Sequence, residues 1–192
     1  MPLFKKEEII GVIKDFFLVR TSIGNSLTLL LVDKEGNIIE NFEGNWLLPE
    51  NWQEENSFWL YQPSQSFSDP TPTMVNILKY NFSTRKREIK SVEIPEYYQY
   101  SEFKPTIIGH YFSCLNIQRE IFLFEFATGK LTKISTRNHQ IISFNLDTTT
   151  KKVNIFEMVN GSQDVTVKFY QLPIADEIDF NKYLKWAKKA KI

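Results

Sequence analysis

Cysteine, histidine and glycine are scarce in this sequence. Its 192 residues include one cysteine, two histidines and seven glycines. A single cysteine cannot form a disulfide within the chain, which excludes a secreted disulfide scaffold. A zinc site needs several converging histidine, cysteine or carboxylate ligands. With so few of the first two, we expect neither a metal nor another cofactor.

Excess charge and long apolar runs are also missing. The chain has 23 lysines and arginines against 23 aspartates and glutamates, whereas a dedicated nucleic-acid-binding protein carries an excess of positive charge. No window approaches 18 uncharged apolar residues, so we expect no integral membrane segment. Lys14 and Asp15 break the only early apolar run, and the start therefore lacks the order of a signal peptide. We expect a soluble, cytoplasmic protein that does not bind nucleic acid.

Motifs of enzymatic chemistry are absent as well. The sequence has no phosphate-binding glycine-rich loop and no G-x-S-x-G nucleophile motif. His110 and Cys114 are expected on one strand, where four residues separate their Cα atoms by roughly 13 Å. This is too far for a nucleophile and its base, so we interpret them as a half-buried histidine and a core cysteine. His139 stands alone at the head of a strand, and a binding protein is favoured over an enzyme.

The residues that are abundant favour β-structure. There are 16 phenylalanines and eight tyrosines, and 42% of the chain is hydrophobic, so it is not disordered. Aromatic and β-branched residues fit the pleated surface of a sheet. Apolar and polar residues alternate in segment 165–172, with Val167 and Phe169 on its apolar face. This pattern predicts one buried face and one solvent-exposed face. Segment 121–126 is apolar on both faces, apart from Glu125, which predicts a strand covered on both sides.

Three predicted hairpins recur along the chain at a regular spacing. Their turns begin at Asp33, Asn81 and Ala127, which are 48 and 46 residues apart. Another predicted strand precedes each hairpin, and a further group of strands follows the third. Gly36 and Gly129 can take the positive φ that hairpin turns require. The predicted strands are 15–21, 27–32, 37–42, 57–62, 74–80, 88–94, 106–115, 121–126, 131–135, 140–146, 152–158 and 165–172.

These strands form about four units of three or four antiparallel strands each. A period of 40–50 residues with several strands per unit is typical of propeller blades, and it favours a small propeller-like fold. The alternative is one meander of about 10–12 strands closed into an up-and-down barrel. Gly44-Asn45-Trp46 resembles the G-x-W motif of lipocalin-like barrels, but it follows several strands. In both cases we expect a single all-β domain over residues 1–173.

A C-terminal α-helix is expected over residues 174–192. Asp176, Glu177 and Asp179 lie near its start, and five lysines follow them. Carboxylates near the N-terminus of a helix and ammonium groups near its C-terminus both stabilise it through the helix dipole. We expect this helix to pack on the β domain or to extend from it.

The most unusual segment is 43–69, which is acidic and aromatic and contains no lysine or arginine. Exposed tryptophan and tyrosine side chains are the usual anchors of binding surfaces, and the connector 95–105, rich in Pro and Tyr, could join the same surface. The alternative is that the tryptophans fill the core or cover a sheet edge. The candidate binding residues are Trp46, Trp52, Glu54, Glu55, Trp59, Tyr61, Tyr97 and Tyr98.

Three functions from different classes remain open. The first, which we favour, is a non-enzymatic module that binds another protein through the acidic-aromatic surface. The second is binding of a sugar or a small apolar ligand in a barrel or a propeller channel. The third is a glycoside-type hydrolase that uses Glu54, Glu55 or Asp69, which requires a carboxyl group with a raised pKa. The oligomeric state is left open, because a strand edge or the terminal helix could pair between chains.

Overall fold

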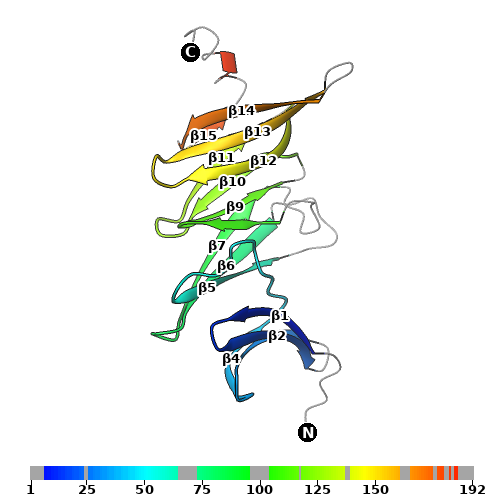
Figure 1. Cartoon of the computed structure of the whole chain (residues 1–192), viewed down its shortest axis with the longest axis vertical. Helices are drawn as coiled ribbons and strands as arrows, with labels where there is room; N and C mark the ends of the chain where they lie inside the picture. The colour runs from blue at the N-terminus through cyan, green and yellow to red at the C-terminus, as the bar shows by residue number, and fades with distance from the viewer. Residues whose placement is uncertain are drawn as a thin grey trace. The chain divides into compact units, whose positions relative to one another are not determined.

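Most of the strands that the sequence predicts are present, and they are arranged in four separate sheets (Figure 1). The computed structural model describes residues 7–23, 26–64, 73–95, 104–116, 118–136, 139–160, 165–174, 177–179, 182, 184 and 185. Among these residues only Lys182, Leu184 and Lys185 have helical backbone, and the named elements are all strands. The all-β prediction is therefore confirmed.

The chain divides into two compact units, and each is described by itself. The first unit contains Met1–Leu48, Trp52–Gln62 and Ile77–Glu88, and the second contains Pro49–Asn51, Pro63–Asn76 and Ile89–Ile192. A single domain over residues 1–173 stays a prediction.

The first sheet lies in the first unit and is a meander in which each strand pairs with the next. Lys14 takes a positive φ of 52° in the turn before the second strand, and Gly36 takes 88° before the fourth. The Asp33 carboxylate accepts hydrogen bonds from the backbone N–H groups of Glu35 and Asn37 at 3.0 and 2.8 Å, as is typical of turns rich in Asp and Asn. The strands are β1 (Glu8–Ile13), β2 (Phe16–Ile23), β3 (Ser26–Asp33) and β4 (Ile38–Glu43).

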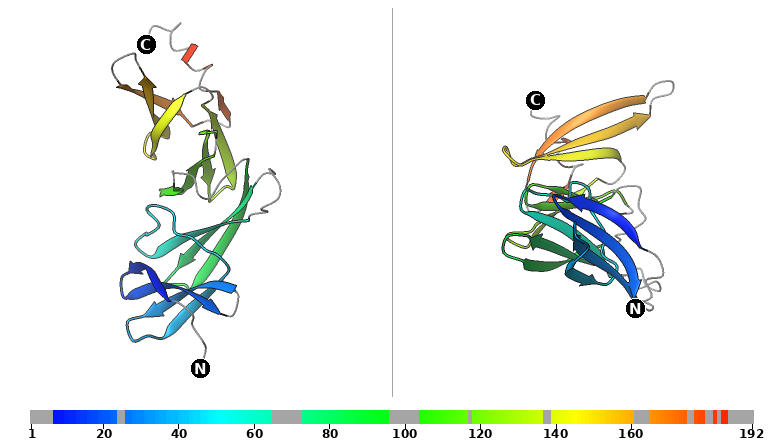
Figure 2. Two further views of the ribbon diagram at one scale, coloured as in Figure 1. Left: turned by 90° about the vertical axis from the view of Figure 1, so that its right-hand side faces the viewer. Right: turned by 60° about the horizontal axis from the view of Figure 1, so that its bottom comes forward.

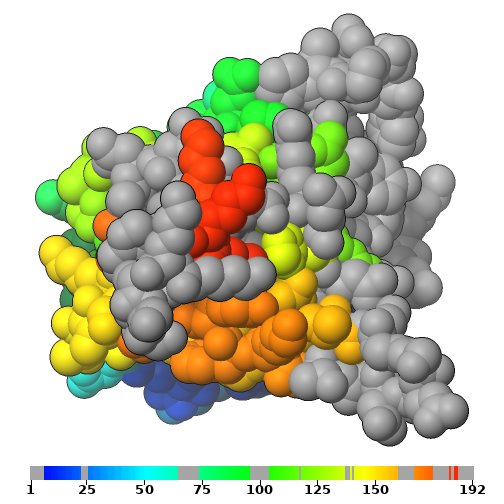
Figure 3. All heavy atoms as spheres, turned by 90° about the horizontal axis from the view of Figure 1, so that it is seen from above, coloured from blue at the N-terminus to red at the C-terminus, as the bar shows by residue number. Residues whose placement is uncertain are grey.

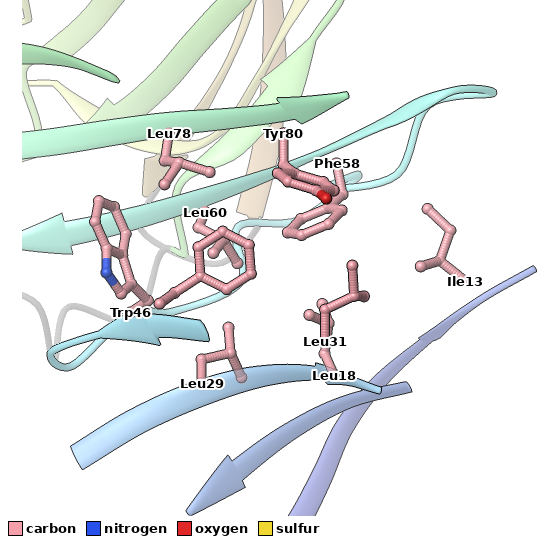
Figure 4. Close-up of a cluster of buried hydrophobic side chains, with 10 residues drawn as sticks. Ile13, Leu18, Leu29, Leu31, Trp46, Phe58, Leu60, Leu78 and Tyr80 are labelled. Atoms are coloured by element: carbon pink, nitrogen blue, oxygen red, sulfur yellow. The ribbon is translucent and has the colours of Figure 1, made fainter. Parts of the chain in front are cut away.

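One face of the first sheet packs on β5 (Ser57–Pro63) and β6 (Thr73–Asn81). The rings of Phe42, Phe58 and Tyr80 lie at the centre, with centroids 5.2 to 5.8 Å apart. Removal of such apolar surface from water is the dominant favourable term in folding. Figure 4 shows the side chains of this core, which are Ile13, Leu18, Leu29, Leu31, Phe42, Trp46, Phe58, Leu60, Leu78 and Tyr80.

The second sheet has the order β5-β6-β7, with β7 at Lys86–Ile94, and its residues are divided between the two units. Strand β5 is buried along nearly its whole length, including Phe58 and Trp59. Because neighbouring residues of a strand point to opposite faces, both faces of β5 are covered. The turn between β6 and β7 is capped by Asn81, whose side-chain oxygen accepts a hydrogen bond from the Thr84 N–H at 2.9 Å.

The third sheet lies in the second unit. Its strands are β8 (Thr106–Ile108), β9 (Tyr111–Leu115), β10 (Ile121–Glu125) and β11 (Lys130–Ser135), joined at the β11 edge by a parallel strand, β15 (Glu177–Asp179). The expectation of one strand over 106–115 is wrong, because Gly109, with φ at 59°, and His110 form a turn that separates β8 from β9. Strand β10 is buried on both faces, as its apolar sequence predicts.

The fourth sheet is the meander β12 (Gln140–Asp147), β13 (Lys152–Asn160) and β14 (Val165–Pro173), drawn from yellow to orange in Figure 2. One of its faces packs on the third sheet within the second unit. Leu146, Val153 and Leu172 lie opposite one another across its strands and point into this core. The buried core residues are Leu115, Ile121, Leu123, Ile134, Ile141, Leu146, Val153, Ile155 and Leu172.

Two expectations about the fold are corrected. Among the described strands no closed barrel is found, because each of the four sheets has a linear strand order. The expectation of a helix over 174–192 is wrong for its first part, since Glu177–Asp179 forms a strand that pairs with the edge of β11. The backbone groups at such an edge are available for hydrogen bonds. Most of the remaining range 180–192 lies outside the described residues.

Candidate functional site

Three of the eight candidate binding residues lie in the interior rather than on the surface. Trp46, Trp59 and Tyr61 expose only 7%, 1% and 4% of their area. Trp59 and Tyr61 belong to β5, which is covered on both faces. The ring nitrogen of Trp46 donates a hydrogen bond to the carbonyl oxygen of Glu43 at 2.9 Å. For these side chains the core-filling interpretation is the one that the structure shows.

Trp52 is half-buried at the border of the first unit's core. Its ring meets that of Phe58 edge-on, with 6.3 Å between the centroids. Gly11 lies directly against the indole, because a Cβ atom at this position would stand 2.8 Å from Trp52 Cζ2. Because Gly11 has no side chain, the Trp52 ring can pack directly on the backbone of β1. The rest of the Trp52 side chain stays accessible to solvent.

The Glu54 carboxylate is held by three neighbours. It accepts hydrogen bonds from Ser57 Oγ at 2.6 Å and Trp59 Nε1 at 2.8 Å, and Lys79 Nζ lies 2.7 Å away. Burial alone would raise the pKa of Glu54, but the hydrogen bonds from Lys79, Ser57 and Trp59 outweigh it and hold this pKa below its usual value. The general acid of a glycosidase needs a raised pKa. Glu54 therefore has the chemistry of a structural anchor for β5.

Of the remaining candidates, the structure describes Glu55. Glu55 is exposed beside Glu54. Tyr97 and Tyr98 lie outside the described residues, as does Asp69. Among the eight candidates, the described and accessible ones are therefore Trp52, Glu54 and Glu55.

The cysteine and the two histidines lie in different surroundings. Cys114 is buried in β9, and burial raises the pKa of its thiol well above the usual value, which disfavours the reactive thiolate. His110 is exposed in the turn before β9, so the expectation of a half-buried histidine on a strand is wrong. His139 Nδ1 and the Tyr170 hydroxyl both bind the buried Glu157 carboxylate, the hydroxyl at 2.8 Å. Burial, together with this carboxylate, raises the pKa of Tyr170 to about 12.

The first sheet carries apolar side chains on its outer face, which is the face turned away from the core of the first unit. The register places one row of these residues across all four strands, Val12, Phe17, Val32 and Ile38, next to the pair Ile9 and Val19. Ile9, Val12 and Ile38 expose 61%, 52% and 57% of their area. Exposed apolar residues gathered in this way indicate an interaction surface.

A groove of about 430 Å³ lies on this outer face. Apolar side chains make up most of its lining, and the charged groups of Glu7, Asp33 and Lys34 line the remainder. The groove is lined by Glu7, Ile9, Phe17, Val19, Val32, Asp33, Lys34 and Gly36. Sequence reasoning missed it, although a signal was present: residues 16–19 read Phe-Phe-Leu-Val, and consecutive apolar residues give a strand two apolar faces.

The fourth sheet also exposes apolar side chains on the face opposite to its core. Val167 and Phe169 are 54% and 57% exposed, and the Phe169 ring packs on Phe156 with 5.3 Å between centroids. Figure 3 shows atoms of β14, in orange, at the surface of the molecule. The expectation that the face of Val167 and Phe169 is the buried one is therefore wrong, because Tyr170 and Leu172 pack on the core instead.

Comparison with known proteins gives no family for this chain. No protein-family model matches it, and no curated protein shows significant similarity to it. Within the described residues, no three histidine, cysteine, aspartate or glutamate side chains are grouped so that they could hold a metal ion. None of the helical backbone in the same residues is long and apolar enough to cross a membrane.

Proposed function

We propose that this protein is a non-enzymatic protein-interaction module and that its partner binds the outer face of the first sheet. The observation that carries the proposal is the row Val12, Phe17, Val32 and Ile38, which crosses four strands and stays accessible to solvent. A sheet positions such residues rigidly, and rigid apolar anchors lose little conformational entropy when a partner covers them.

The chemistry of this face also favours a kind of partner. Burial of its apolar area would contribute roughly 25 cal/mol for each Å² removed from water. Glu7 and Asp33 line the groove beside a single cation, Lys34. A protein segment that presents aliphatic or aromatic side chains flanked by basic residues would match both features.

The finer parts of the sequence-based interpretation are kept as proposals. The four sheets have three to five strands each, near the four of a propeller blade, and the turn spacing of 48 and 46 residues supports a propeller-like fold. Trp52 and Glu55 are accessible enough to add contacts with a partner. A cytoplasmic location belongs to the same proposal.

The groove volume favours a second candidate function, binding of a small apolar ligand. About 430 Å³ falls within the range of roughly 300–1,000 Å³ that is common for small-molecule sites. A ligand would be held by Ile9, Phe17 and Val32, without the need for a protein partner.

The test is partner capture with matched surface variants of the full chain. Three proteins would be purified gently from the protein's own source: wild type, the double variant Ile9→Lys with Ile38→Lys, and Ile89→Lys. The mass bound to each would be measured by native mass spectrometry. Ile89 is the control because it is exposed to 54% but lies on β7. Exposed substitutions of this kind change stability by about 0.5 kcal/mol or less, so all three proteins should stay folded.

We expect a stoichiometric protein partner on wild type and on Ile89→Lys, bound at least tenfold more weakly by the double variant. A partner retained equally by all three proteins would contradict the proposed surface. A mass increase of a few hundred daltons that only the double variant loses would replace the protein partner by a small ligand. No added mass on wild type would refute both functions.

A further inference from the structure

A second, polar cavity of about 160 Å³ lies in the second unit, where the third and fourth sheets meet. Four of its lining residues come from the third sheet. The register places Tyr111, Glu125 and Lys130 directly opposite one another on β9, β10 and β11. Thr132 lies two residues after Lys130 and therefore on the same face. This face is the one that packs on the fourth sheet, since Leu123, the cross-strand partner of Thr132, belongs to their shared core.

The fourth sheet closes the cavity through Lys151 and Ile174. Lys151 lies in the turn between β12 and β13, and its carbonyl oxygen accepts a hydrogen bond from the Ile174 N–H at 3.1 Å. The same turn is fixed by the Asp147 carboxylate, which accepts hydrogen bonds from the backbone of Thr149 and Thr150 at 3.0 and 3.1 Å. These hydrogen bonds fix the backbone of the turn that carries the Lys151 side chain.

The lining residues carry more positive than negative charge. Lys130 and Lys151 bring two ammonium groups, against one carboxylate from Glu125. That carboxylate already accepts hydrogen bonds from the Tyr111 hydroxyl at 3.3 Å and from Thr128 Oγ1 at 2.6 Å. Burial, with Glu125 nearby, raises the pKa of Tyr111, so its hydroxyl keeps its proton at neutral pH and donates it to Glu125.

We propose that this cavity binds a small oxyanion, in the form of a phosphate or carboxylate group, between Lys130 and Lys151. The hydroxyl group of Thr132 serves as an additional donor. Hydrogen bonds from ammonium groups to anionic oxygens are about twice as strong as those between neutral groups. A water molecule occupies about 30 Å³ of the liquid, so the cavity has room for a phosphate ion or a short carboxylic acid. This site is separate from the outer face of the first sheet.

The test is a titration of the full chain with sodium phosphate and, separately, with sodium acetate. Chloride would keep the ionic strength constant, because salt screens charges at the surface. Binding would be followed by calorimetry and by the melting temperature, which rises when a ligand binds the folded state alone. We expect saturable binding of one anion per chain, and the tighter of the two probes identifies the preferred group. The absence of saturable binding by either probe would overturn the proposal.

Matched variants locate the site. Lys130→Gln and Lys151→Gln should each raise the dissociation constant at least tenfold, and Lys151→Arg should keep it within a few-fold of wild type. Lys152→Gln is the control, because the Lys152 ammonium group points to the other face of the sheet and donates to Gln171 Oε1 at 3.1 Å. Unchanged binding in both Gln variants, or an equal loss in Lys152→Gln, would show an adventitious ion only and overturn the site. Melting in chloride alone reports whether each variant is folded.

Discussion

Replacement of Trp59 by alanine tests whether the tryptophan-rich segment belongs to the core or to a surface. Trp59 is 1% exposed, its ring nitrogen donates to Glu54 Oε1 at 2.8 Å, and Lys79 Nζ lies 4.7 Å from its ring centroid. Truncation of a buried tryptophan costs about 3–5 kcal/mol, and a hydrogen bond to a charged group contributes roughly 1.5–3 kcal/mol. Because these terms overlap, we expect Trp59→Ala to lose about 4–6 kcal/mol of unfolding free energy. That is a large part of the roughly 5–15 kcal/mol that stabilises a typical domain.

Urea denaturation followed by both circular dichroism and tryptophan fluorescence measures this loss. Two probes are needed because two compact units need not unfold in one transition. Trp59→Phe keeps a buried ring and loses only the N–H group, so its cost should be about 1.5–3 kcal/mol; this variant supplies the measurement if Trp59→Ala does not fold. A Trp59→Ala protein within about 1 kcal/mol of wild type, below the range for buried tryptophan, would refute the assignment of Trp59 to the interior.

Two further predictions concern titratable groups. Hydrogen bonds hold the pKa of Glu54 below its usual value, so the unfolded chain takes up this proton at a higher pH than the folded protein does. The stabilisation from Glu54 is therefore present above about pH 4.5 and is lost as pH falls through the lowered pKa. The urea midpoint of wild type should therefore drop more steeply below pH 5 than that of Glu54→Gln, and parallel curves would contradict the anchoring role. Cys114 is buried with a raised thiol pKa, so a disulfide reagent should modify it only in urea, whereas rapid modification of the native protein would place the thiol at the surface.

Turn chemistry made the strands predictable from the sequence. Asp33 and Asn81 cap their turns with side-chain oxygens, and Gly36 and Gly129 have the expected positive φ. Strand β1 is not among the predicted strands, and Lys14 and Asp15 end the apolar run that forms it. Lys14 takes a positive φ in a tight hairpin turn, a conformation that costs a non-glycine residue only about 1–2 kcal/mol.

Side-chain burial was less predictable, because it depends on which sheets pack together. Strand β14 has apolar residues on both faces, and its alternation does not specify that Leu172 faces the third sheet while Phe169 faces solvent. Trp59 is among the candidate binding residues, with the core as the alternative, although 57–62 is itself predicted as a strand. Its apolar sequence on both faces was the available signal for burial. The groove on the outer face of the first sheet is not predicted for the same reason: both faces of β2 are apolar, so its sequence does not specify which face is covered.

The parallel pairing of β15 with β11 has a consequence for the order of folding. This contact joins Lys133 to Glu177, and the entire β12–β14 meander lies between them in the chain. Closing such a long loop costs conformational entropy before the hydrogen bonds of the pairing can stabilise the chain. We therefore expect β15 to dock only after the meander has formed. The same three-residue strand has few hydrogen bonds to lose. Its amide protons should therefore exchange with deuterium before those of β10, through a local opening that leaves the rest of the second unit folded.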